Sequence, residues 1–73
     1  MELPEGVTLI VFLRPRGTEK FNAVRYEDNE EHKELRIFGP DDKLVREFHG
    51  GNMEKWEIVD ADNKITKRSS YPI

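Results

Sequence analysis

The segment VTLIVFL, residues 7–13, decides the fold. It has one polar residue, Thr8, so a strand formed by it is apolar on both faces. An extended strand alternates its side chains between two faces, with Leu9, Val11 and Leu13 on one face and Ile10 and Phe12 on the other. A strand at the surface of a small domain has one apolar face, whereas this strand has two. One face belongs to the core, and the second face needs a cover of its own.

Short apolar runs and dense turn signals characterise the rest of the chain. The turn signals lie at residues 15–17, 28–29, 39–42, 50–52 and 60–63. The runs between them predict strands at residues 20–26, 34–38, 44–48, 53–59 and 64–67. We therefore expect an all-β fold, a small antiparallel meander of about five to six strands, with at most one short helical turn near residues 28–33.

Three loops supply the connections of this meander. Pro40 predicts a type I turn, and Asp60 with Asn63 predicts a hairpin turn closed by a left-handed residue and a bulge. Gly50 and Gly51 are expected to adopt positive φ. Together these turns predict a four-stranded antiparallel meander over residues 34–67.

No amphipathic helix of useful length is available to cover the sheet, so we expect a strongly curved sheet or a small open barrel. The predicted core consists of Val24, Leu35, Ile37, Phe48, Trp56 and Ile58. The 73 residues form a single domain, 1–73, in which residues 1–6 and 68–73 are expected to be tails.

Composition narrows the classes of function. The chain has no Cys, so a disulfide and a thiolate metal site are excluded. The residues before position 7 lack a basic signal region, and the apolar run is too short to span a membrane, which predicts a cytoplasmic protein without membrane contact. The charge is uneven: five acidic residues and one lysine lie within residues 27–34, and three basic residues lie within residues 64–73.

The apolar first strand is the candidate interaction site. In a simple meander it is also an edge strand, and a long apolar edge is a template for pairing with another chain. The sequence therefore predicts an accessory protein that acts by protein–protein interaction and self-associates as a homodimer through Val7–Leu13, with strand addition by a partner protein as a second mode. The candidate interface residues are Leu9, Ile10, Val11, Phe12 and Leu13. A monomer whose tails cover this strand, or in which the strand is central, is the competing interpretation.

Nucleic-acid binding is the alternative function. Small β-barrels bind nucleic acid through basic side chains and stacking aromatics, and the first hairpin offers Arg14, Arg16, Lys20 and Arg25. The net charge of −3, from 12 basic and 15 acidic residues, argues against this function.

Catalysis is not expected. His49 precedes a glycine pair, where Glu47 and Glu54 could approach it as partners of a general base or as metal ligands. A surface histidine beside a turn explains the same pattern, and His32 lies in the acidic segment. The paired aspartates, Asp41 with Asp42 and Asp60 with Asp62, lie in predicted turns and are interpreted as turn-forming residues. The sequence indicates no enzyme, no cofactor, no metal and no small-molecule substrate.

Overall fold

The computed structural model describes residues 2–22 and 25–70. Within these residues it has seven strands and one 3-10 turn, which confirms the all-β antiparallel prediction. The elements are β1 (Thr8–Leu13), β2 (Thr18–Phe21), β3 (Arg25–Asn29), β4 (Glu34–Phe38), η1 (Pro40–Asp42), β5 (Leu44–His49), β6 (Met53–Val59) and β7 (Ile65–Ser70). No helix in this described part of the chain has the length and hydropathy to cross a membrane.

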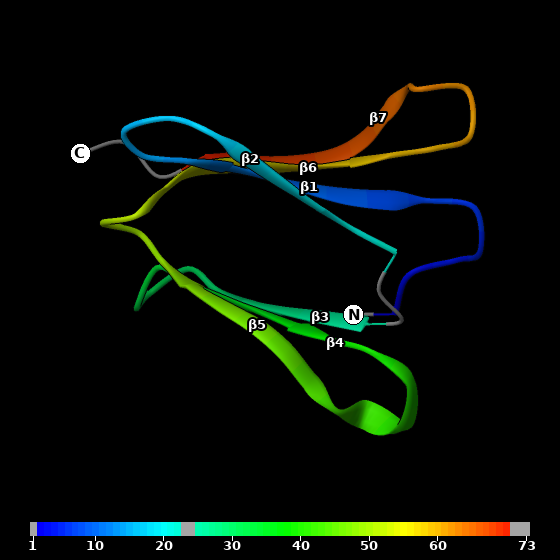
Figure 1. The fold of residues 1–73 in the computed structure, drawn as a ribbon, viewed down its shortest axis with the longest axis horizontal. Helices are drawn as coiled ribbons and strands as arrows, with labels where there is room; N and C mark the ends of the chain where they lie inside the picture. The colour runs from blue at the N-terminus through cyan, green and yellow to red at the C-terminus, as the bar shows by residue number, and fades with distance from the viewer. Residues whose placement is uncertain (1, 23–24, 71–73) are drawn as a thin grey trace.

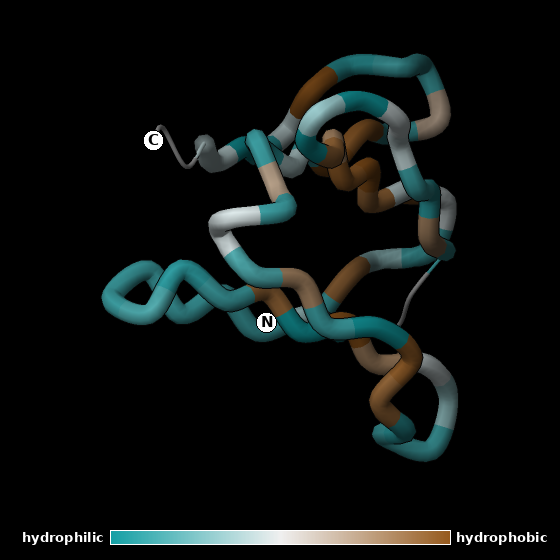
Figure 2. The backbone as a smooth tube through the Cα atoms, turned by 60° about the vertical axis from the view of Figure 1, so that its left-hand side comes forward, coloured by the Kyte–Doolittle hydropathy of each residue, from teal (hydrophilic) through white to brown (hydrophobic). Residues whose placement is uncertain are grey.

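Two sheets form two layers (Figure 1). The four-stranded sheet has the order β2-β1-β6-β7, and the three-stranded sheet has the order β3-β4-β5. Figure 2 shows hydrophobic segments gathered toward the space between the layers and mostly hydrophilic turns. The two sheets remain separate in their hydrogen bonding, so the curved layers do not close into a barrel.

The core lies between the layers and agrees with the sequence pattern. Leu35, Ile37, Phe48, Trp56 and Ile58 are buried, as predicted, and Val24 lies outside the described residues. The buried set also contains Leu9, Val11, Tyr26 and Met53. The inward residues alternate with polar ones along β4 and in β6 from Trp56 onward, and the bounds of both strands match their prediction. At the start of β6 the alternation is broken between Met53 and Trp56, where the register against β1 shifts.

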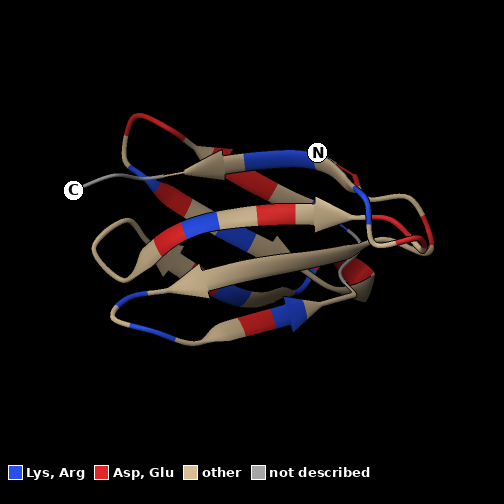
Figure 3. Cartoon of the chain, turned by 90° about the horizontal axis from the view of Figure 1, so that it is seen from above, with Lys and Arg blue, Asp and Glu red and all other residues tan. Residues whose placement is uncertain are grey.

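Strand β1 is central rather than an edge, which corrects the sequence prediction. It pairs with β2 on one side and with β6 on the other. In Figure 3 the uncharged β1 lies between these two charged strands. The β1–β2 hairpin places β2 along one edge of β1. The other edge, which would be open in a simple meander, pairs with β6, a strand distant in sequence.

The second face of β1 is covered within the chain. Its outward residues Ile10 and Phe12 are half-buried. The Lys55 ammonium lies 4.6 Å from the centre of the Phe12 ring, and Ile10 has Lys20 and Glu57 as its cross-strand neighbours. Long charged side chains lay their aliphatic stems over apolar surface and keep their charges in water. Neighbouring strands thus supply the cover.

The predicted strand 20–26 is wrong as a single strand, because the chain divides into β2 and β3 in opposite sheets. Residues five positions apart point to opposite faces of one strand. Phe21 packs against the core and Tyr26 belongs to it, so both point inward only if the strand is interrupted. Part of this connection, Ala23 and Val24, lies outside the described residues.

The predicted single meander over residues 34–67 is also wrong. Strands β5 and β6 follow one another but belong to different sheets. Phe48 and Met53, again five positions apart, are both buried, so the loop carries the chain from one layer to the other. Gly50 and Gly51 do not adopt positive φ. A Cβ on Gly50 would lie 2.8 Å from the Lys33 Cβ, so glycine there permits a close approach of two loops.

The remaining turns give a mixed result. Asn63 adopts φ 62°, its N–H donates to the Asp60 carbonyl at 3.0 Å, and the register shifts after Ile58, which confirms the predicted turn with its bulge. The prediction of a type I turn at Pro40 is wrong, because Asp41 and Asp42 have φ of 62° and 59°. These left-handed values suit the twist of a hairpin.

The segment near residues 28–33 is a turn without a helix. The Asn29 side chain accepts a hydrogen bond from the His32 N–H at 3.1 Å, which closes the turn locally. The expected tails are partly ordered structure. Arg68 and both serines after it complete β7, and Glu2 forms an isolated bridge with Arg25.

Candidate functional site

The edges of the two sheets meet at two boundaries, and one boundary is closed by side chains. There Arg46 of β5 donates from Nε to the Glu19 carboxylate of β2 at 3.0 Å. The rings of Phe21 and Phe48 contact edge to face, with centroids 5.9 Å apart. The hydrogen bonds that Arg46 donates to Glu19 raise the pKa of Arg46, more than the charge of Glu19 does. We call this contact between β2 and β5 the closed boundary.

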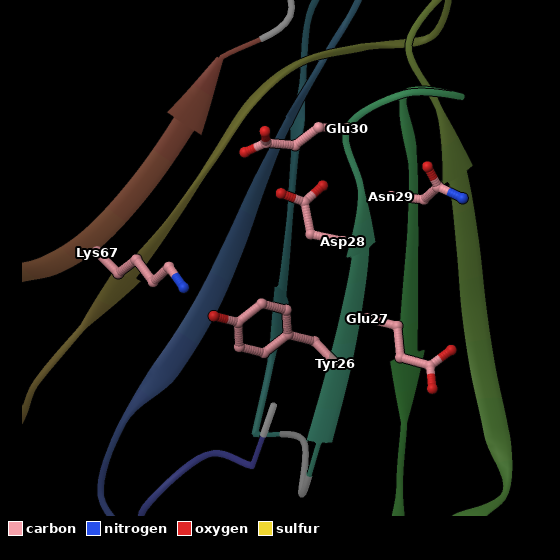
Figure 4. A pocket seen from close by; sticks show the side chains of 6 residues that line it. All are labelled: Tyr26, Glu27, Asp28, Asn29, Glu30 and Lys67. Atoms are coloured by element: carbon pink, nitrogen blue, oxygen red, sulfur yellow. The ribbon is translucent and has the colours of Figure 1, made fainter.

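The boundary between β3 and β7 is a groove of about 620 Å³, which we call the β3 groove. Its lining residues are Tyr26, Glu27, Asp28, Asn29, Glu30 and Lys67. Figure 4 shows Tyr26, Asp28 and Glu30 directed toward β7, and Lys67 directed toward β3. Glu27 and Asn29 point to the other side of β3, as the alternation along a strand requires.

Tyr26 forms the base of the groove. Its side chain is 2% exposed, and its ring lies 5.2 Å from the ring of Trp56 in the core. The Lys67 ammonium lies 5.7 Å from the centre of the Tyr26 ring. The base is therefore held rigidly, while the charged side chains stand at the walls.

The backbone edge of β3 faces this groove. β3 pairs with β4 on one side, and on its other side the described residues contribute a single isolated bridge, from Glu2 to Arg25. β7 likewise pairs only with β6 among the described strands. An unpaired strand edge presents N–H and C=O groups that another extended chain can bond.

The acidic and the basic segments of the sequence lie on opposite sides of this groove. The acidic segment supplies Glu27, Asp28 and Glu30 to the lining, and the basic segment supplies Lys67. Of the charged side chains directed into the groove, the two carboxylates of Asp28 and Glu30 outnumber the one ammonium group of Lys67, so the groove favours a cationic occupant. The sequence contained both segments, but the packing of β7 beside β3 was needed to bring them together.

The interface residues predicted from the sequence do not share one accessible surface. Leu9 and Val11 are fully buried in the core of the same chain. Leu13 packs against that core beside a register shift in β1. Ile10 and Phe12 alone point outward from β1, and both are half-buried.

The four basic residues of the predicted nucleic-acid surface are also separated. Arg14 and Arg16 line one pocket, and Lys20 lies on β2 opposite the outward Ile10. Arg25 lies in the other sheet, where it donates to Glu27 at 2.7 Å and to Asp42 at 2.8 Å. These hydrogen bonds, first that of Glu27 and then that of Asp42, raise the pKa of Arg25.

His49 does meet carboxylates, but only one of the two predicted ones. Its Nε2 lies 3.1 Å from Glu47, while Glu54 lies on β6 in the other sheet. Its Nδ1 lies 3.6 Å from Glu34, which the sequence analysis missed because only the register of β4 against β5 pairs Glu34 with His49.

These three side chains can offer ligand atoms within 4.8 Å of one another to a metal ion. The Arg36 guanidinium lies 3.6 Å from Glu47 and 3.8 Å from Glu34. A metal ion at this exposed cluster would have to compete with that cation for both carboxylates.

Comparisons with protein-family models, with curated proteins and with solved structures find no match to this chain. The functional argument therefore rests on the geometry of the described residues.

Proposed function

We propose that this domain is a protein-interaction module without catalytic activity that binds an extended, basic segment of a partner protein in the β3 groove. The segment adds a strand to the open edge of β3. The observation that carries this proposal is an outer strand edge, bridged among the described residues by Glu2 alone, that lines a groove of about 620 Å³. In strand addition the main chain provides affinity, and alternate side chains provide specificity.

The chain's own N-terminal segment supports this mode of binding. Glu2 already forms an antiparallel bridge with Arg25, at the first residue of β3. This bridge occupies one end of the edge, and the partner segment would extend it along the part from Tyr26 onward, where the described residues contribute no further isolated bridge. An extended partner would thus continue a pairing that the fold has begun.

Charge complementarity defines the partner. Alternate residues of an added strand would point toward Tyr26, Asp28 and Glu30, the side chains that Figure 4 directs into the groove. A Lys or Arg at these positions would meet the carboxylates of Asp28 and Glu30. An acidic partner segment would instead be repelled by these carboxylates.

The experiment is a titration of the isotopically labelled protein with a peptide of alternating Lys and Val, followed by amide hydrogen exchange. We expect binding with new protection of β3 amides. Asp28→Asn and Glu30→Gln should each weaken it, and Glu54→Gln, which removes a charge from β6, should not. A peptide of alternating Glu and Val is the matched control ligand.

Two outcomes would contradict the proposal. The first is equal binding of the Lys and Glu peptides, which would remove charge complementarity. The second is binding of the Lys peptide without protection of β3 amides, which would mean that side chains alone attract it.

The homodimer expected from the sequence stays a prediction. Its argument from an exposed edge no longer holds, because β1 is central. Of the predicted interface residues, only Ile10 and Phe12 point outward, and both are half-buried. Light scattering over a concentration series tests it, since a dimer would show twice the monomer mass. The cytoplasm as the place of action also stays a prediction from the sequence.

A further inference from the structure

A basic pocket lies beside the closed boundary, away from the β3 groove. It has a volume of about 230 Å³, and its polar lining consists of Arg14, Arg16, Arg46, Glu47, His49 and Asn52. We call it the arginine pocket. The arginines come from the β1–β2 loop and from β5, which are far apart in sequence.

The loop that carries two of the arginines is fixed by main-chain hydrogen bonds. The Arg14 N–H donates to the Asn52 carbonyl at 2.9 Å, which ties the β1–β2 loop to the β5–β6 loop. The Leu13 N–H donates to the Gly17 carbonyl at 2.8 Å and closes the hairpin. The backbone that positions Arg14 and Arg16 is therefore ordered before any ligand arrives.

The third arginine is fixed through its side chain. The Arg46 guanidinium lies 4.6 Å from the centre of the Phe48 ring and bonds the Glu19 carboxylate. A guanidinium has five N–H donors, and Glu19 engages the Nε and one Nη group. Arg46 keeps further donors for a ligand while its orientation is held.

We propose that the arginine pocket binds a phosphate-bearing ligand, specifically the terminal phosphate or diphosphate group of a small molecule. Planar guanidinium groups match phosphate oxygens in pairs of parallel hydrogen bonds. Three guanidinium groups face two carboxylates here, that of Glu47 in the lining and that of Glu19, which accepts from Arg46. A water molecule occupies about 30 Å³ of liquid, so the pocket has room for a phosphate group.

A nucleic-acid backbone has the same phosphate chemistry but needs a longer track. Lys20 and Arg25 lie outside the pocket, on different sheets, and Arg25 is engaged by Glu27 and Asp42. Figure 3 shows acidic and basic segments interspersed along the strands of the four-stranded sheet. This distribution favours a single phosphate site over a continuous surface for a nucleic acid.

The test uses pyrophosphate as the probe, titrated by NMR or calorimetry at low ionic strength into the full chain. Arg14→Gln and Arg16→Gln should each raise the dissociation constant about tenfold, because each removes a charged hydrogen bond. Arg68→Gln on β7 makes the same charge change outside the pocket and should leave it nearly unchanged. Glu19→Gln should lower the dissociation constant, because it releases donors of Arg46.

Three results would overturn the proposal. One is a loss of affinity in Arg68→Gln as large as in Arg16→Gln, which would indicate attraction by net charge alone. Another is saturable pyrophosphate binding that Arg16→Gln leaves unchanged; Arg16 is exposed, so this variant stays folded even if Arg14→Gln does not. The third is binding of a single-stranded oligonucleotide that is tighter than that of pyrophosphate and that Lys20→Gln and Arg25→Gln weaken as much as Arg16→Gln does. That result would assign the phosphate binding to a nucleic-acid surface.

Discussion

The two boundaries between the sheets contain the same kinds of element but differ in their side chains. At the closed boundary, Phe21 and Phe48 pack edge to face, and the Arg46–Glu19 pair lies beside them. At the β3 groove, Tyr26 packs against Trp56 beneath the groove, and carboxylates and Lys67 form the walls. Aromatic surface closes one boundary, whereas charged groups that retain their hydration keep the other open.

This difference explains how a small domain can have a stable core and an available strand edge. The closed boundary contributes apolar burial that both sheets share. The groove gives up such burial, and on this edge of β3 the described residues contribute one bridge, from Glu2 to Arg25. We expect substitutions at the closed boundary to change mainly the free energy of unfolding, and substitutions in the groove to change mainly binding.

The largest effect should come from the core that both boundaries share. Val11→Lys places an unpaired charge at a fully buried position and should destabilise the domain by more than about 4 kcal/mol. Circular dichroism should show an unfolded chain at every protein concentration. Ile10→Lys, its neighbour on the outward face, should remain folded, because a lysine stem can lie along that surface. A folded Val11→Lys monomer would refute this assignment of the two faces.

The next effect tests the closed boundary directly. Phe48→Ala removes the buried ring that meets Phe21 and should lower the free energy of unfolding by about 3–5 kcal/mol. Urea denaturation measures the difference. Phe12→Ala is the matched control on the outward, half-buried face and should cost clearly less. Equal losses in the two variants would mean that the closed boundary contributes no special stability.

A smaller effect is expected for the ion pair at the same boundary. Arg46→Gln and Glu19→Gln should each lower the urea midpoint much less than Phe48→Ala, since exposed ion pairs contribute little. The double variant should resemble either single one, because both remove the same interaction. Raising the salt concentration should reduce the stabilisation that this ion pair contributes in the wild type. A loss as large as that of Phe48→Ala would identify the ion pair as the main closing contact.

The smallest effect on stability should occur in the groove. Lys67→Ala changes an exposed wall residue and should alter the free energy of unfolding by no more than about 0.5 kcal/mol. The same variant should bind the alternating Lys and Val peptide more tightly, because it removes the cation that competes with the peptide. A large loss of stability would show that Lys67 holds the two sheets together.

Local patterns in the sequence determined the elements. Alternation defined the bounds of β4, the part of β6 from Trp56 onward and the two faces of β1, and Asp60 with Asn63 defined their turn. These features depend on residues within one strand or one loop, where side-chain period and turn chemistry act directly. The burial of Leu35, Ile37, Phe48, Trp56 and Ile58 follows from the same period.

The tertiary structure alone decided which strands are neighbours. β1 is central because β6, forty residues or more along the chain, pairs with it, and no local pattern encodes that pairing. The same non-local packing placed β7 beside β3 and assembled the β3 groove. It also joined Arg46 to Arg14 and Arg16 in the arginine pocket, and Glu34 to His49. The period of a strand specifies which side chains point inward, whereas the partner of each edge depends on how the whole chain buries its apolar surface.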